Sequence, residues 1–246
     1  MKAFFADSRY RLAHAIVSCI VIAGLFLDKD IWRAFVYGPP ASNPPPSQLI
    51  RMVLMQSAFF GALLLLLWVT TLFRGRKTAD EKKETPPFTK IQSVLFACKW
   101  FVPVCLIAFA TEFLSLGIFK EFFDIELPPQ DLVRWLKPGA YPSYVQYTLM
   151  AMAVVEAPIV EELLFRGVIF KGLGTKLPLW PSILVSGFVF AMVHVSAATL
   201  LPLWILGAAF AWVYAKTGSI LAPVSMHFLF NALNLVLCLA FPEMAQ

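Results

Sequence analysis

The chain alternates long apolar stretches with short polar or proline-rich segments. Seven of these stretches approach or reach the roughly 17–25 apolar residues that a helix needs to cross about 30 Å of hydrocarbon. They are residues 12–27, 49–73, 93–118, 144–170, 179–197, 199–215 and 219–241. The pattern predicts an all-α fold, a polytopic membrane helical bundle of about seven transmembrane helices.

The composition favours a membrane protein over a soluble domain. Of the 246 residues, 59% are hydrophobic and 14% are charged, and the mean hydropathy is +0.74. A typical soluble domain has about 25% charged residues. No small-residue cleavage site follows the first stretch convincingly, so we expect it to be a retained span and not a removed signal peptide.

Ionisable residues inside the apolar stretches are concentrated toward the C-terminus. The first three stretches hold only His14 and Glu112 at depth, and the last four hold most of the others. We therefore expect one membrane domain with two parts. Residues 1–143 supply the first transmembrane segments and a polar cytoplasmic linker at 74–92, and residues 144–246 supply the helices that carry any catalytic residues.

The net charge of +5 is better explained by membrane topology than by nucleic acid, because Lys and Arg gather in the loops. With a cytoplasmic N-terminus, thirteen Lys and Arg residues fall on the inner side and six on the outer side. The positive-inside rule therefore predicts a cytoplasmic N-terminus. The size and the loop charges fit a bacterial inner membrane, and we expect no nucleic-acid partner.

The segment VEAPIVEELLFRGVIF, residues 155–170, places ionisable side chains where each charge costs about 2.5–3.5 kcal/mol to insert. Glu162 and Arg166 lie one helical turn apart, so we expect an ion pair that offsets part of this cost. Glu161 points elsewhere and has no obvious local partner. Burial disfavours the charged form of such a carboxylate, which suits a general base. A purely structural ion cluster is the alternative.

Two later stretches add imidazoles and an amide at helical spacing. FVFAMVHV places Phe190 and His194 four residues apart, and SMHFLFNALN does the same for His227 and Asn231. Residues four apart share a helix face. A single histidine of this kind is more often a packing residue that is hydrogen-bonded across the bundle. Here two of the three histidines lie on different helices and are expected to face the helix with the paired glutamates.

These residues allow two chemical arrangements. In the first, Glu161 and His194 hold a water, and the glutamate removes its proton as the water attacks a peptide carbonyl. His227 and Asn231 then donate hydrogen bonds to the developing oxyanion. In the second, His194, His227 and Glu161 bind Zn²⁺. The spacing does not require a metal, so we expect peptide hydrolysis without a cofactor.

Other proteolytic chemistries lack their motifs. The sequence has no H-E-x-x-H zinc motif, no aspartate within an apolar stretch and no G-x-S-x-G elbow. Ser186 and Ser225 are intramembrane hydroxyls, but a serine in a helix usually bonds to its own backbone. Two other classes of function stay open. They are a proton-coupled transporter, because intramembrane Glu and His also build proton relays, and a catalytically silent immunity-type membrane protein.

Three motifs, EELLFR at 161–166, FAMVH at 190–194 and HFLFN at 227–231, follow one another in separate apolar stretches. Together they resemble the CAAX protease and bacteriocin-processing family of glutamate-dependent intramembrane proteases, also called the CPBP or Abi family. The resemblance covers about residues 155–234, and the N-terminal half has no motif that we can assign. It implies a helical membrane fold with the site among the motif helices.

The resemblance also implies roles for individual residues. It makes Glu161 the base that activates water with His194, and it makes His227 and Asn231 the oxyanion-stabilising pair. Supporting positions are Glu162, Arg166 and Phe190. Some relatives trim prenylated CAAX tails and others resemble bacteriocin-processing or immunity proteins, so the expected substrate is a membrane-embedded or lipid-anchored protein or peptide in the bilayer.

Overall fold

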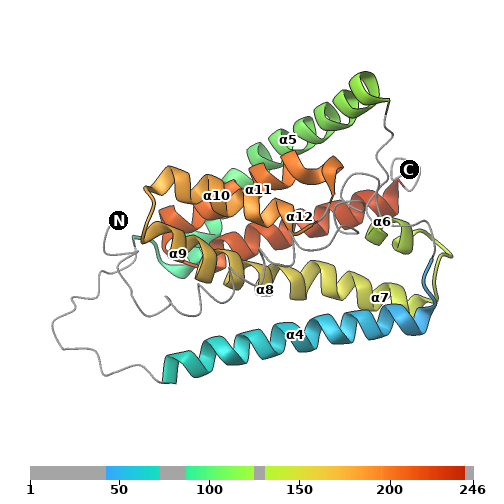
Figure 1. Cartoon of the computed structure of the whole chain (residues 1–246), viewed down its shortest axis with the longest axis horizontal. Coiled ribbons are helices and arrows are strands. Elements are labelled where there is room, and N and C mark those ends of the chain that lie inside the picture. The colour runs from blue at the N-terminus through green and yellow to red at the C-terminus, as the bar shows by residue number, and fades with distance from the viewer. Residues whose placement is uncertain (1–42, 73–86, 125–130, 195, 242–246) are drawn as a thin grey trace.

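A computed structural model describes residues 43–72, 87–124, 131–194 and 196–241. This part of the chain is 86% helical and contains no strand. The prediction of an all-α membrane helical bundle is confirmed. Figure 1 shows most of the long helices running roughly along one common direction.

The helices follow one another with short connections. In chain order they are α4 (Pro46–Leu72), α5 (Lys90–Phe123), α6 (Asp131–Leu136), α7 (Ser143–Ala151), η2 (Met152–Glu156), α8 (Ala157–Leu164), η3 (Phe165–Phe170), α9 (Lys171–Gly174), α10 (Leu179–Met192), α11 (Ala197–Thr217) and α12 (Leu221–Ala240). The elements η2 and η3 are turns of π-helix. Both lie within the continuous helical run from Ser143 to Gly174.

Every predicted apolar stretch within the described residues overlaps a helix. The stretch at 12–27 lies outside the described residues, as does most of the predicted linker at 74–92. By length and composition, the described helices that could cross a membrane are α5, α11 and α12, and α10 is a shorter apolar helix of 14 residues. The protein is therefore an integral membrane protein, and the total of about seven spans stays a prediction.

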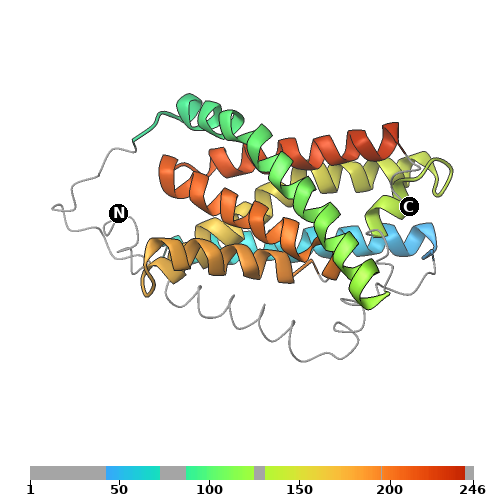
Figure 2. The same cartoon turned by 90° about the horizontal axis from the view of Figure 1, so that it is seen from above.

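The bundle packs around the C-terminal helices. Helix α11 packs against α10, α5 and α12, and α12 also packs against α8 and η2. On the other side of the α7–α9 run lies α4, which packs against α7 (Figure 1). Seen from above, α5 crosses obliquely over the helices beneath it (Figure 2). The main apolar core joins side chains from α5, α8, η3, α10, α11 and α12.

Helices α10 and α11 approach closely at two glycines. A Cβ atom on Gly187 would lie 2.6 Å from the backbone nitrogen of Ala208, and one on Gly207 would lie 2.9 Å from the Cα atom of Gly187. A real Cβ atom does not lie within 3.0 Å of another residue's heavy atom. The absence of a side chain at both positions lets the two backbones touch, as small residues do between membrane helices.

Helix α10 ends earlier than predicted. The apolar stretch at 179–197 predicts one helix, but the helix ends at Met192, and His194 lies in the turn that follows. The reason is that Ser196 already caps the next helix, with an extended backbone and a side-chain oxygen that accepts from the Thr199 amide at 3.4 Å. Apolar residues continue through this turn, so hydrophobicity alone does not reveal it.

Candidate active site

The predicted ion pair between Glu162 and Arg166 is present and completely buried. Arg166 Nη1 donates to Glu162 Oε1 at 2.9 Å, and both side chains have 0% exposure. The second guanidinium nitrogen, Nη2, donates to the carbonyl of Gly207 on α11 at 2.8 Å. Gly207 is also one of the two glycines at which α10 and α11 touch.

Three aromatic rings surround the Arg166 guanidinium. Its central carbon lies 4.8 Å from the ring centre of Phe190, 5.2 Å from that of Phe210 and 5.8 Å from that of Phe165. Ring faces attract a cation, most strongly when water is excluded. The rings therefore compensate part of the lost hydration of Arg166.

His227 on α12 joins the same cluster. Its Nδ1 lies 3.0 Å from Glu162 Oε1, the oxygen that also accepts from Arg166. A carboxylate accepts hydrogen bonds, so Nδ1 carries the proton and Nε2 is left pointing away from Glu162. The imidazole stacks on Phe210 with ring centres 4.9 Å apart and planes tilted by 23°. Glu162 and Phe210 together fix the tautomer and the plane of this ring.

His194 approaches from the end of α10. Its Nδ1 lies 2.8 Å from the carbonyl oxygen of Phe190, which can only accept, so Nδ1 is the donor and Nε2 has a free lone pair. The Phe190 ring packs beside it with ring centres 4.8 Å apart. The predicted Phe190–His194 pairing is thus present, although His194 reaches the site from a turn and not from within a helix.

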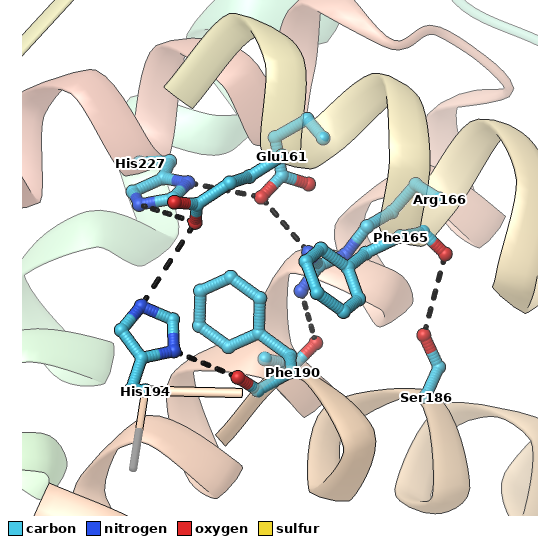
Figure 3. Close-up of polar contacts among 9 residues, drawn as sticks. Glu161, Phe165, Arg166, Ser186, Phe190, His194 and His227 are labelled. Carbon is cyan, nitrogen blue, oxygen red and sulfur yellow. Dashed lines mark hydrogen bonds and ion pairs between the residues drawn. The ribbon is translucent and has the colours of Figure 1, made fainter. Parts of the chain in front are cut away.

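Glu161 lies where the two histidines meet (Figure 3). Its Oε2 atom is 3.9 Å from His227 Nε2 and 4.0 Å from His194 Nε2. This oxygen is buried and has no hydrogen-bond partner among the described residues, while the side chain as a whole is 18% exposed. Three groups that accept hydrogen bonds therefore converge on one point at the accessible edge of the buried cluster.

Asn231 lies one turn after His227 on α12 but has a different contact. Its Nδ2 atom donates to the carbonyl of Ala153, in the π-turn η2, at 2.8 Å. One amide proton is used in this bond, and the second stays available because the NH₂ group has two donors. An oxyanion-stabilising role for Asn231 stays a prediction.

Sequence reasoning missed two members of the cluster, Phe210 and Gly207. Both lie on α11, a stretch in which we identified no chemical motif, yet one stacks on His227 and the other binds Arg166. A glycine three residues before an aromatic residue in an apolar helix is a weak signal. It could have suggested close helix packing, but not the partner.

The zinc alternative of His194, His227 and Glu161 stays a prediction, as does the metal-free one. Within the described ranges, no group of three or more His, Cys, Asp or Glu side chains is placed so that it could hold a metal ion. His194, His227 and Glu161 do converge, but at separations of 3.9–4.0 Å between their nearest atoms.

Comparisons with known proteins cover the part of the chain that carries this cluster. Residues 143–233 match the family model described as Type II CAAX prenyl endopeptidase Rce1-like. The chain is also 31% identical over 89 residues to a Bacillus subtilis (strain 168) protein named "Putative membrane peptidase YdiL". That similarity covers 36% of this chain and 36% of the relative, so the chain matches about a third of the relative's length. No solved structure matches significantly.

The matched region contains every residue of the cluster, from Glu161 on α8 to Asn231 on α12. The resemblance that the three sequence motifs suggested is therefore confirmed at the level of the family. Residues 143–233, a little over a third of the chain, are therefore similar to the Rce1-like CAAX protease family.

Proposed function

We propose that this protein is an intramembrane endopeptidase that hydrolyses a peptide bond in a membrane-embedded or lipid-anchored substrate. The observation that carries the proposal is the convergence of Glu161 Oε2 with Nε2 of His194 and Nε2 of His227 within 4.0 Å. The family match and the name of the Bacillus relative favour peptide hydrolysis over a transporter.

The space between Glu161 Oε2 and the two histidine Nε2 atoms can bind the water molecule that attacks the peptide bond. Glu161 Oε2 and His194 Nε2 both offer lone pairs, and a water has two O–H groups to donate to them. In this position its oxygen lone pairs point away from the two acceptors, toward the carbonyl carbon of a bound peptide. As the new C–O bond forms, the water proton passes to Glu161 Oε2.

The developing negative charge on the carbonyl oxygen is stabilised by His227 and Asn231. His227 donates a hydrogen bond from Nδ1 to Glu162, so its Nε2 can donate a second one only when the ring is doubly protonated. The Glu162 carboxylate stabilises that imidazolium, in the way a buried carboxylate supports a catalytic histidine in hydrolases. Asn231 adds its second N–H, and its Ala153 contact holds the amide in place beforehand.

Collapse of the tetrahedral intermediate breaks the C–N bond and completes the reaction. The leaving nitrogen takes a proton from Glu161, which returns to its carboxylate form, and the new carboxyl group is released. Glu162 and Arg166 do not contact the reacting atoms in this scheme. They hold His227 and the α8 backbone in position.

The first test replaces Glu161 by Gln, which keeps the shape and removes the base. We expect turnover per folded molecule to fall by about 10²- to 10⁴-fold. The yield of folded protein should not change. Purified protein in liposomes is offered a farnesylated peptide ending in a CAAX sequence and a panel of membrane-spanning peptides, and products are mapped by mass spectrometry. Glu112→Gln, which changes an intramembrane glutamate on α5, is the matched control and should cleave normally.

Two results would contradict the proposal. One is equal cleavage by Glu161→Gln and the unmodified protein, and the other is no cleavage of any probe by the unmodified protein. A chelator in the same assay tests the metal-free scheme. We expect no change, whereas a loss of activity that added Zn²⁺ restores would replace water activation by Glu161 with a metal mechanism.

A further inference from the structure

The π-turn η2 lies directly before the helix that carries the glutamate pair. In this turn the amide of Ala157 donates to the carbonyl of Met152, five residues earlier, in place of Ala153, four residues earlier. The Ala153 carbonyl therefore loses its usual partner within the helix. Asn231 supplies the replacement from α12, at 2.8 Å.

A second contact holds the same turn from the opposite side of the run. Ser57 Oγ on α4 donates to Glu156 Oε2, at the end of η2, at 2.9 Å. Leu49, Val53 and Ser57 follow one another at intervals of four residues and so share one face of α4. Leu49 and Val53 on this face are buried, with 1% and 7% exposure. On this apolar face the hydroxyl is directed at a carboxylate that has no place in the hydrolytic scheme.

A π-turn changes the direction of every side chain that follows it. It accommodates one extra residue compared with an α-helical turn, so the following helix is rotated by about 100°. Glu161 and Glu162 come only five and six residues after Glu156. Their directions toward His194 and His227 therefore depend on this turn keeping its extra residue.

We propose that η2 is the element that aims the glutamate pair, and that Glu156 and Ser57 are positioning residues that hold it. Glu156 acts as a hydrogen-bond acceptor for Ser57 and not as a base. Asn231 has the same effect through its contact with Ala153. The proposal rests on the proposed peptidase function, because its main test measures turnover.

The first experiment compares three substitutions in the liposome cleavage assay. Ser57→Ala and Glu156→Ala each remove the hydrogen bond, and we expect kcat to fall about 10- to 100-fold with little change in KM. Glu156→Gln keeps a carbonyl oxygen that accepts from Ser57, so it should retain turnover within about twofold. If Glu156 were a base, the Gln and Ala variants would be equally inactive, and this result would overturn the proposal.

Thr148→Val is the matched control for loss of a hydroxyl. Thr148 Oγ1 donates within its own helix, to the Tyr144 carbonyl at 2.8 Å, and among the described residues it makes no hydrogen bond to another helix. This variant should keep full turnover. A similar loss of kcat in Thr148→Val and Ser57→Ala would mean that the Ser57 effect is a general effect of helix perturbation.

The second experiment tests the rotation directly by deleting Val155, a residue of η2 that is 49% exposed. Without the extra residue, the part of the run before η3 becomes regular α-helix, so the protein should fold but lose cleavage. Inserting one alanine after Ala157 in the deletion variant restores the residue count and should recover part of the turnover. Folded yield is measured by gel filtration in detergent for every variant.

The outcomes separate this proposal from the proposed function. No cleavage by the unmodified protein argues against the peptidase. Cleavage by the unmodified protein together with normal kcat in Ser57→Ala and in the folded Val155 deletion argues against the positioning role alone. If the deletion variant does not fold, the Glu156→Gln and Glu156→Ala comparison decides.

Discussion

Arg166 makes contacts that depend on the shape of its guanidinium group. It donates to Glu162 and to the Gly207 carbonyl from two different nitrogens while its flat faces meet aromatic rings. A lysine has a single charged nitrogen and no flat faces, so it could not make this set of contacts. The charge at this position thus has a structural use that is separate from catalysis.

Removing one partner of the buried pair should be worse for stability than removing both. In Glu162→Gln, Arg166 is left buried without its counter-ion, and we expect the free energy of unfolding to fall by about 3–5 kcal/mol. The double variant Glu162→Leu with Arg166→Met has no buried charge and should recover much of this stability. Denaturant unfolding in detergent measures both variants.

Cleavage by the double variant then separates the two roles of Glu162. It should stay inactive despite its recovered stability, because His227 has lost the carboxylate that binds its Nδ1 proton. Normal turnover in the double variant would show that Glu162 only supports the fold. A double variant as unstable as Glu162→Gln would mean that packing, and not the unpaired charge, causes the loss.

The residues of the site differ in how far the sequence could predict their contacts. The Glu162–Arg166 pair follows from a spacing of four and was predicted correctly. The contact between Glu162 and His227 joins residues that are 65 positions apart, and helical periodicity says nothing about such a pair. Likewise, the Asn231 contact with Ala153 exists because a π-turn frees a carbonyl. Pro158, just after the turn, marks a disturbed helix in the sequence but does not reveal this partner.

At the scale of elements, the site depends on how closely α10 and α11 approach. Their contact at Gly187 and Gly207 brings the Gly207 carbonyl to Arg166 and places Phe210 against His227. The sequence predicted both helices. It did not predict this crossing, because glycines are also common in membrane helices without such contacts.

Gly187→Ala should force these two helices apart. The new methyl group would lie 2.6 Å from the backbone of Ala208, which cannot turn away as a side chain does. We expect a loss of about 1–3 kcal/mol in the free energy of unfolding, together with reduced cleavage, because the Gly207–Arg166 bond lengthens. Unfolding in detergent and the liposome assay measure the two effects.

Gly117→Ala is the matched control for this prediction. Gly117 also lies in a long membrane helix, α5, but a methyl group there would meet no atom within 4 Å. Its stability should stay the same or rise by up to about 1 kcal/mol, since alanine favours a helix more than glycine does. Equal losses in the two variants would remove the helix crossing as the cause.

At the scale of the whole molecule, the predicted orientation in the membrane awaits measurement. We expect a cytoplasmic N-terminus and an outer C-terminus, because Lys and Arg are concentrated on one set of loops. In a bacterial host, green fluorescent protein fused to the N-terminus should fluoresce, and alkaline phosphatase fused to the C-terminus should be active. The same enzyme fused to the N-terminus should be inactive, and the reverse pattern would contradict the assignment.

Helix α10 has only 14 residues and is therefore about 21 Å long, against a hydrocarbon thickness of about 30 Å. A membrane helix that is shorter than the hydrocarbon layer is accommodated when the bilayer becomes thinner around it. Because His194 lies two residues after the end of α10, such thinning would draw headgroups and interfacial water toward Glu161. A scissile bond would then be cut near the edge of the hydrocarbon, at a depth that a lipid-anchored chain end reaches without crossing the membrane.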